Sequence, residues 1–210
     1  MVMEAMPAAL DEAALQGLRA WTGRSEETRD DITAAPLRGW SATLDRADAP
    51  PRPGDGVPPL GHWLYFLPQA PQGELGPDGH PRRGGFLPPV PLPRRMWAGG
   101  RLAWNADNPL RVGDAARRVS RIESVSHKSG RSGEMVFVLV KHEVHNARGL
   151  ALTEEHDIVY RGAPLPGATP PAPQAAEQQA PWRREIVPDP VLLFRYSALT
   201  FNGHGIHYDR

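Results

Sequence analysis

The sequence predicts an α+β protein in which short helices precede an antiparallel sheet. Three observations support this fold class: apolar residues at helical spacing near the N-terminus, four strand-like runs between residues 96 and 161, and turn residues between two of those runs. The chain has 210 residues and is 40% hydrophobic, which suits a real core in one domain or two small ones.

Two helices are expected near the N-terminus. Residues 10–21 carry acids in the first turn and apolar side chains at helical spacing, which we interpret as a packing face: Leu15, Leu18 and Trp21. A second helix is expected over residues 32–44, with Pro36 near its first turn, where proline is tolerated.

An aromatic run at residues 61–68 follows a loop rich in proline and glycine, and it predicts a buried strand. Residues 69–94 contain glycines and spaced prolines that exclude a regular helix or a central strand. Irregular loops of this length often act as lids or binding loops. Arg94 and Arg95 close the loop and are suited to bind a phosphate. Solvated charges flanking a strand are an equally good interpretation of this pair.

Four strands are expected next and should pair as an antiparallel meander, since each run is rich in strand-forming residues. They are residues 96–104, 116–128, 134–146 and 150–161. Glycine and serine at residues 128–133 supply the tight turn between the second and third strands.

The third of these runs contains His142 and His145, a spacing that invites a zinc interpretation. A zinc helix motif needs two histidines four apart on one helical face, whereas residues three apart on a strand point to opposite sides. No metal site is therefore predicted, and these histidines are expected to act with Glu143 on an exposed face.

Composition excludes several classes of function. The chain has 24 basic and 24 acidic residues, so it carries no global positive charge for nucleic acid or for an anionic membrane. It has no cysteine, which excludes disulfides and cysteine-ligated metals. The N-terminus does not resemble a secretory or transit peptide, and no run is long enough for a membrane span. A soluble cytoplasmic protein is expected.

A proline-, alanine- and glutamine-rich segment divides the chain. Residues 162–181 contain few large apolar side chains and are expected to form an extended linker. This linker separates an N-terminal domain at residues 1–161 from a C-terminal segment at residues 182–210.

The C-terminal segment gathers the side chains best suited to chemistry. Residues 191–200 are apolar and aromatic and predict a buried strand, after which Asn202 begins a polar turn. The candidates for proton transfer are His204, His207 and Asp209, because an oriented histidine can exchange a proton near neutral pH. The alternative is a polar turn whose histidines are merely solvated.

This segment resembles the catalytic segment of the R-specific enoyl-CoA hydratases, which are MaoC-like hot-dog proteins. Residues 194–209 are similar to a narrower branch of this family, through the pattern Phe-Arg-Tyr-Ser-Ala-Leu-Thr-Phe-Asn-x-His-x-Ile-His-Tyr-Asp. That branch comprises the mesaconyl-CoA (3-methylfumaryl-CoA) hydratases and the type 2 hydroxyacyl-thioester dehydratases. Residues 63–68, 84–100 and 157–161 are similar to the same branch. The resemblance implies a double hot-dog fold whose second half is incomplete here.

The resemblance also implies an activity and its residues. The activity is reversible addition of water to an enoyl-CoA thioester, with mesaconyl-C4-CoA giving citramalyl-CoA as the expected reaction and no cofactor beyond the CoA of the substrate. His207 would be the acid or base and Asn202 would position water and His207. Supporting or substrate-binding roles fall to His204, Asp209, Tyr196, Arg195, Arg94 and Arg95.

Two other functions stay open. One is dehydration of 3-hydroxyacyl thioesters in fatty-acid synthesis, and the other is a non-catalytic hot-dog subunit that binds acyl-CoA. In this family the thioester oxygen is bound by amides of a helix expected after residue 210. The 210-residue chain is therefore expected to be inactive alone and to associate with itself or with a complementary hot-dog segment.

Overall fold

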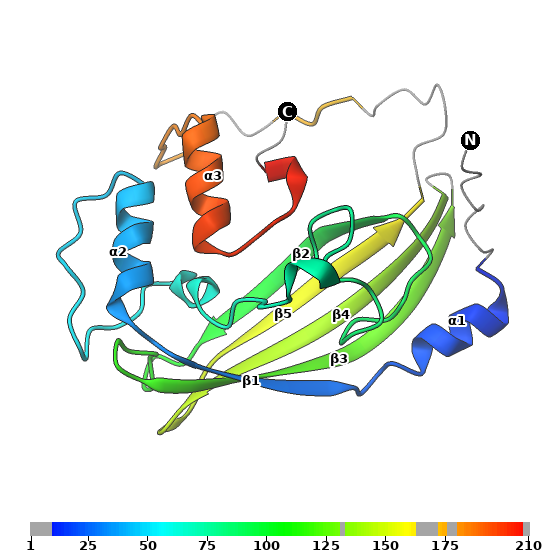
Figure 1. Ribbon diagram of the computed structural model, residues 1–210, viewed down its shortest axis with the longest axis horizontal. Helices are drawn as coiled ribbons and strands as arrows, with labels where there is room; N and C mark the ends of the chain where they lie inside the picture. Colours follow the sequence, from blue (N-terminus) through cyan, green and yellow to red (C-terminus); the bar gives the residue numbers. More distant parts are fainter. Residues whose placement is uncertain (1–9, 131–132, 163–171, 176–179, 208–210) are drawn as a thin grey trace.

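A five-stranded antiparallel sheet forms the centre of the protein, as the computed structural model shows (Figure 1). The structure describes residues 10–130, 133–162, 172–175 and 180–207. The strands lie in the order β1-β3-β4-β5-β2. Their bounds are β1 (Ser25–Asp31), β2 (Arg94–Trp104), β3 (Ala115–Gly130), β4 (Gly133–Asn146) and β5 (Gly149–Arg161).

The four expected strands are confirmed, but their pairing as a simple meander is wrong. β3, β4 and β5 follow one another as hairpins, whereas β2 crosses over to pair with β5 at the far edge. The other edge is β1, which the sequence did not predict. Its residues are all polar or charged and mostly exposed, so it lacks the apolar alternation that reveals a half-buried strand.

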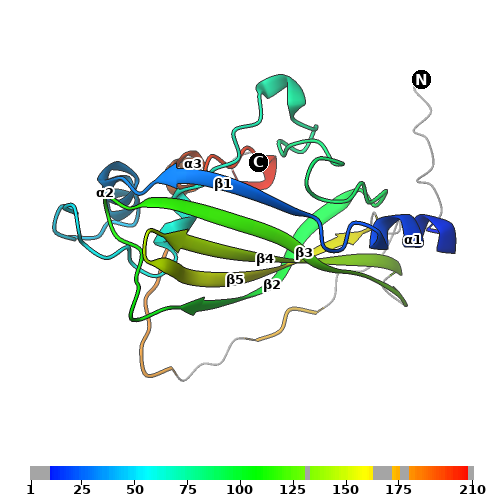
Figure 2. The same cartoon turned by 90° about the horizontal axis from the view of Figure 1, so that it is seen from below.

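Both N-terminal helices are confirmed, as α1 (Glu12–Arg19) and α2 (Ala34–Thr43). Asp11 caps α1 by accepting a hydrogen bond from the Ala14 amide at 2.8 Å. Leu15 and Leu18 are buried against the sheet, as the helical spacing predicted. Figure 2 shows α1 at one end of the sheet and α2 at the other.

The aromatic run at residues 61–68 is not a strand. It forms the 3₁₀ helix η1 (Gly61–Leu64) and then a loop that buries Leu64, Tyr65 and Phe66. Leu60 and Phe66 adopt positive φ angles, which end any extended run. Aromatic residues here fill the core from a loop, so their burial was predicted correctly and their backbone was not. The following loop contains only the short 3₁₀ helix η2 (Gln72–Glu74), in agreement with the irregular passage expected there.

The covered face of the sheet carries two apolar clusters with a polar row between them. One cluster joins α1 to the proline-rich loop through residues such as Val90, Ile122 and Val138. The other joins α2 and the η1 loop through residues such as Leu37, Phe66 and Val144. The polar row crosses three strands at positions between the two clusters: Arg118, Ser120, His142, Glu154 and His156.

The expected strand at residues 191–200 is also wrong, because these residues form the helix α3 (Pro190–Leu199). Asp189 caps the helix by accepting from the Leu192 amide at 2.8 Å, and Pro190 occupies its first turn. An apolar run of this length is ambiguous between helix and strand, and here the capping residues decide. α3 packs against α2 and leads to the 3₁₀ helix η3 (Gly205–His207).

The expected linker falls mostly on residues outside the described ranges, and the domain division at residues 162–181 stays a prediction. No helix in the described parts of the chain is long and apolar enough to cross a lipid bilayer.

Candidate active site

The turn after α3 brings the two expected catalytic residues together through His204. The His204 amide donates to Asn202 Oδ1 at 3.0 Å, and the His204 carbonyl accepts from the His207 amide at 3.1 Å. The His204 and His207 rings lie 5.7 Å apart between centroids. Because the Asn202 oxygen already accepts the backbone bond, its NH₂ group is the part available to donate to another molecule.

Asn202 and His207 line one pocket of about 300 Å³. Its wall comes from the end of α2 and one side of α3, mainly through apolar side chains: Leu44, Leu192, Leu193, Tyr196, Ser197 and Thr200. Burial raises the pKa of the Tyr196 phenol, so this group is a neutral hydrogen-bonding partner at neutral pH. An apolar pocket with a few converging polar groups is the usual form of a small-molecule site.

A further histidine, which no sequence motif indicated, lies against this turn. The ring of His80 stands 4.7 Å from that of His204 between centroids, with 31° between the planes. Burial and the positive charge of Arg95 lower the pKa of His80 to about 4, against the opposing effect of Asp78. The signal that could have found it is its place in the irregular loop at residues 69–94, because loops of this length often act as lids or binding loops.

The other expected site residues differ in their exposure to solvent. Arg95 is partly buried; burial is the main cause that lowers the pKa of both His80 and His156, and the positive charge of Arg95 acts in the same direction. Arg94 precedes it on β2 and is exposed, and Arg195 on α3 is exposed too. Asp209 lies outside the described residues.

The polar row on the covered face of the sheet forms a buried network with the 3₁₀ helix η1. Glu154 accepts hydrogen bonds from Trp63 Nε1 at 3.1 Å and contacts His62 Nε2 at 3.0 Å. Burial acts to raise the Glu154 pKa, but the contacts with His62 and Trp63 outweigh it, so this pKa is lowered. Arg118, also in this row, has its Nε buried without a hydrogen-bond partner among the described residues.

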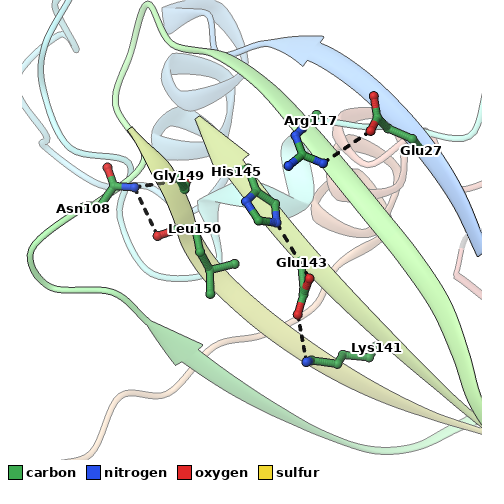
Figure 3. A network of polar contacts seen from close by, with 8 residues as sticks. All are labelled: Glu27, Asn108, Arg117, Lys141, Glu143, His145, Gly149 and Leu150. Carbon is green, nitrogen blue, oxygen red and sulfur yellow. Dashed lines mark hydrogen bonds and ion pairs between the residues drawn. The ribbon is translucent and has the colours of Figure 1, made fainter. Parts of the chain in front are cut away.

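The row corrects the prediction for the histidines of β4. His142 lies on the covered face, where its Nδ1 is 2.8 Å from Ser120 Oγ, and burial lowers its pKa to about 4. His145 lies on the open face beside Glu143, which also pairs with Lys141 at 2.8 Å (Figure 3). The opposite orientation of the two histidines is confirmed, but only His145 has the expected exposed-face role. In the described part of the chain, no three histidine or acidic side chains are arranged to hold a metal ion.

Comparisons with known proteins point to one family. Residues 60–210 match the family of hydroxyacyl-thioester dehydratases type 2. The chain is 50% identical over 193 residues to the mesaconyl-C(4)-CoA hydratase of Chloroflexus aurantiacus, an alignment covering 91% of this chain and 68% of that protein. The crystal structure of HtdX from Mycobacterium tuberculosis superimposes with a TM-score of 0.51 at 15% identity, covering 88% of this chain and 66% of HtdX. The chain thus spans about two thirds of the length of each of these two proteins. These matches confirm the expected α+β hot-dog class.

Proposed function

This chain belongs to the hydroxyacyl-thioester dehydratase type 2 family, and we propose that it adds water reversibly across the double bond of an enoyl-CoA thioester. The proposed substrate is mesaconyl-C4-CoA, with citramalyl-CoA as the product, because the most informative relative is named for this hydration at 50% identity. One structural observation supports the site: Asn202 and His207, tied together through His204, line the same pocket.

The proposed chemistry assigns separate tasks to the two side chains. The His207 imidazole accepts a proton from water while the water oxygen bonds to the β-carbon of the enoyl group. The electrons of the double bond move toward the thioester carbonyl, and the protonated His207 then gives its proton to the α-carbon, which completes hydration and restores the neutral imidazole. The Asn202 NH₂ group donates to the water oxygen and orients it. Asn202 is an amide, so it cannot share the role of base, and His207 alone carries it.

The thioester oxygen also needs hydrogen-bond donors as it gains negative charge. We propose that a complementary hot-dog segment or a second copy of the chain supplies them. The Arg95 side chain, and Arg94 beside it, remain our candidates for contact with the CoA phosphates. Tyr196, which lines the pocket, and Arg195 are the candidates for contact with the acyl group.

The second candidate function is dehydration of a 3-hydroxyacyl thioester, which the family description favours. Dehydration is the reverse of the proposed reaction and would use the same two residues. The acyl group distinguishes the candidates, because mesaconyl-C4-CoA carries a second carboxylate and a straight-chain hydroxyacyl thioester does not.

The test is an assay of the natural enzyme assembly with mesaconyl-C4-CoA and with 3-hydroxybutyryl-CoA, following the enoyl-thioester absorbance. We expect faster turnover of mesaconyl-C4-CoA and a loss of about a hundredfold or more in His207→Ala, the usual contribution of a positioned acid or base. His145→Ala is the matched control, since this histidine lies on the open face of the sheet. Equal activity of His207→Ala and His145→Ala would place the chemistry elsewhere.

A further inference from the structure

We propose that the loop at residues 76–80 holds the catalytic turn in place, with His80 as a positioning residue for His204. Through His204 the loop would fix the relative placement of Asn202 and His207. This inference rests on the proposed function for its catalytic consequence, but its structural part can be tested without activity.

The first support is a backbone contact that only glycine permits. Gly79 has a φ of +79°, and a Cβ atom added to it would lie 1.9 Å from the carbonyl oxygen of Gly203. In the opposite direction, a Cβ on Gly203 would lie 2.9 Å from the Gly79 carbonyl oxygen. The loop and the catalytic turn therefore meet backbone to backbone, with no room for a side chain at Gly79.

Hydrogen bonds within the loop define its shape. The Gly76 amide donates to the His80 carbonyl at 2.7 Å, and the Gly79 amide donates to the Gly76 carbonyl at 3.0 Å. Asp78 Oδ1 accepts from the His80 amide at 3.1 Å, and Leu75 and Pro81 form an antiparallel bridge beside this turn. These bonds fix the direction in which the His80 ring leaves the loop.

His80 contacts the residue on which the site geometry depends. His204 is bonded through its amide to Asn202 and through its carbonyl to the His207 amide. A flat ring 4.7 Å from the His204 ring limits how far this residue can rotate or shift. Any shift of His204 would move Asn202 and His207 relative to each other, which is costly for catalysis because rate depends steeply on alignment.

Electrostatics agree with this packing. Burial is the main cause that lowers the His80 pKa to about 4, followed by Arg95, and the nearby His204 and His207 act in the same direction. Asp78 is the facing group that acts to raise it. At neutral pH the His80 ring is therefore uncharged, and it can lie against His204 whatever the protonation state of the catalytic histidines.

The decisive variant is Gly79→Ala, with Gly54→Ala as the matched control. Both glycines have positive φ angles, of +79° and +89°, so both variants carry backbone strain, but a Cβ on Gly54 meets no atom within 4 Å. The first measurement is the NMR titration of His80. We expect its midpoint near 4 in the parent and in Gly54→Ala, and a midpoint displaced toward 6.5 in Gly79→Ala because the ring loses its buried place. An unchanged midpoint in Gly79→Ala would overturn the proposal.

The second measurement separates positioning from a general structural role. His80→Ala should lower kcat by about tenfold or more, through misalignment of the catalytic pair, with a smaller change in KM. His80→Phe keeps a flat ring against His204 and should recover most of that loss. Equal kcat values for His80→Ala and the parent would overturn the positioning role.

The two measurements also keep this inference distinct from the proposed function. If the titration midpoint of His80 moves in Gly79→Ala but no hydration occurs in the parent, the loop contact stands and the proposed reaction fails. If hydration occurs in the parent and Gly79→Ala behaves as Gly54→Ala in both assays, the reaction stands and the positioning role fails.

Discussion

The central sheet and the segment from α3 to η3 differ in where their apolar side chains lie. Val136 and Val138 on β4 are completely buried, whereas Val191 and Phe194 on α3 are 63% and 64% exposed. Both regions are rich in large apolar residues, so composition does not distinguish them. The difference is that helices and loops cover the apolar side chains on one face of the sheet, whereas α3 packs mainly against α2.

This difference separates stability from activity. Burial of apolar area is the main source of folding free energy, so most of it should come from the sheet and its covering elements. The C-terminal segment is held by fewer contacts, such as the bond from Arg184 to the Leu44 carbonyl at 2.9 Å and the close packing of Leu199 on Gly39. A segment with few buried contacts opens more easily than a core strand, and the proposed catalytic residues lie in such a segment.

The largest expected effect on stability comes from replacing one isoleucine in the sheet, compared with replacing one in the segment from α3 to η3. Ile122 on β3 is 0% exposed and Ile206 in η3 is 75% exposed. Ile122→Ala should lower the free energy of unfolding by about 2–5 kcal/mol, because it leaves a cavity in the core. Ile206→Ala should change it by no more than about 0.5 kcal/mol. Urea unfolding measures the free energy of unfolding of each variant. Similar decreases in the two variants would show that the segment from α3 to η3 contributes to the core.

The dependence of stability on pH provides the next test. Burial, then Arg118, His156 and His62, lower the His142 pKa to about 4 against the effect of Glu154. Since the unfolded histidine has a pKa near 6.5, the unfolded chain binds more protons between these values, and stability is complete above pH 6.5 and falls toward pH 4. His142→Gln should make this decline shallower, as measured by urea unfolding at several pH values.

His145→Gln is the control for this titration, because His145 lies on the open face beside Glu143. An equal flattening of the pH dependence in both variants would show that the buried position of His142 is not the cause.

The smallest expected effect distinguishes the two helices that begin with a capping aspartate. Asp11 and Asp189 accept equivalent amide bonds of 2.8 Å, so either alanine variant should lose about 1 kcal/mol of helix stability. Because α1 buries Leu15 and Leu18, Asp11→Ala should lower global stability. Asp189→Ala should instead increase hydrogen exchange within α3 at nearly unchanged global stability. Loss of global stability in both variants would show that α3 contributes to the core as α1 does.

The sequence was most informative where a run rich in strand-forming residues lies in the sheet. Such runs located β2, β3, β4 and β5 to within a few residues. This signal failed for β1, whose polar side chains are mostly exposed and which is held through its backbone pairing with β3. It also misassigned residues 61–68 and 191–200, where apolar residues serve a loop and a helix. An apolar or aromatic run reports burial more directly than it reports backbone conformation.

The candidate site was predictable only where its residues are adjacent in the chain. Asn202, His204 and His207 could be selected from one short segment, and the pocket brings Asn202 and His207 together. His80 is more than a hundred positions away, and its contact with His204 depends on two glycines meeting in space. No local pattern in the sequence encodes such a contact.

The strand order also has a consequence for the route by which the chain folds. The hairpins that join β3, β4 and β5 close very short loops, between Gly130 and Gly133 and between Asn146 and Gly149. By contrast, β1 meets β3 across 90 positions, as in the pair of Glu27 and Arg117. Closing a long loop costs more chain entropy, so the three central strands can assemble first and the two edge strands add to a template that already exists. Until β1 and β2 arrive, both edges of that template are open, and this interval is when neighbouring chains can pair with it and aggregate.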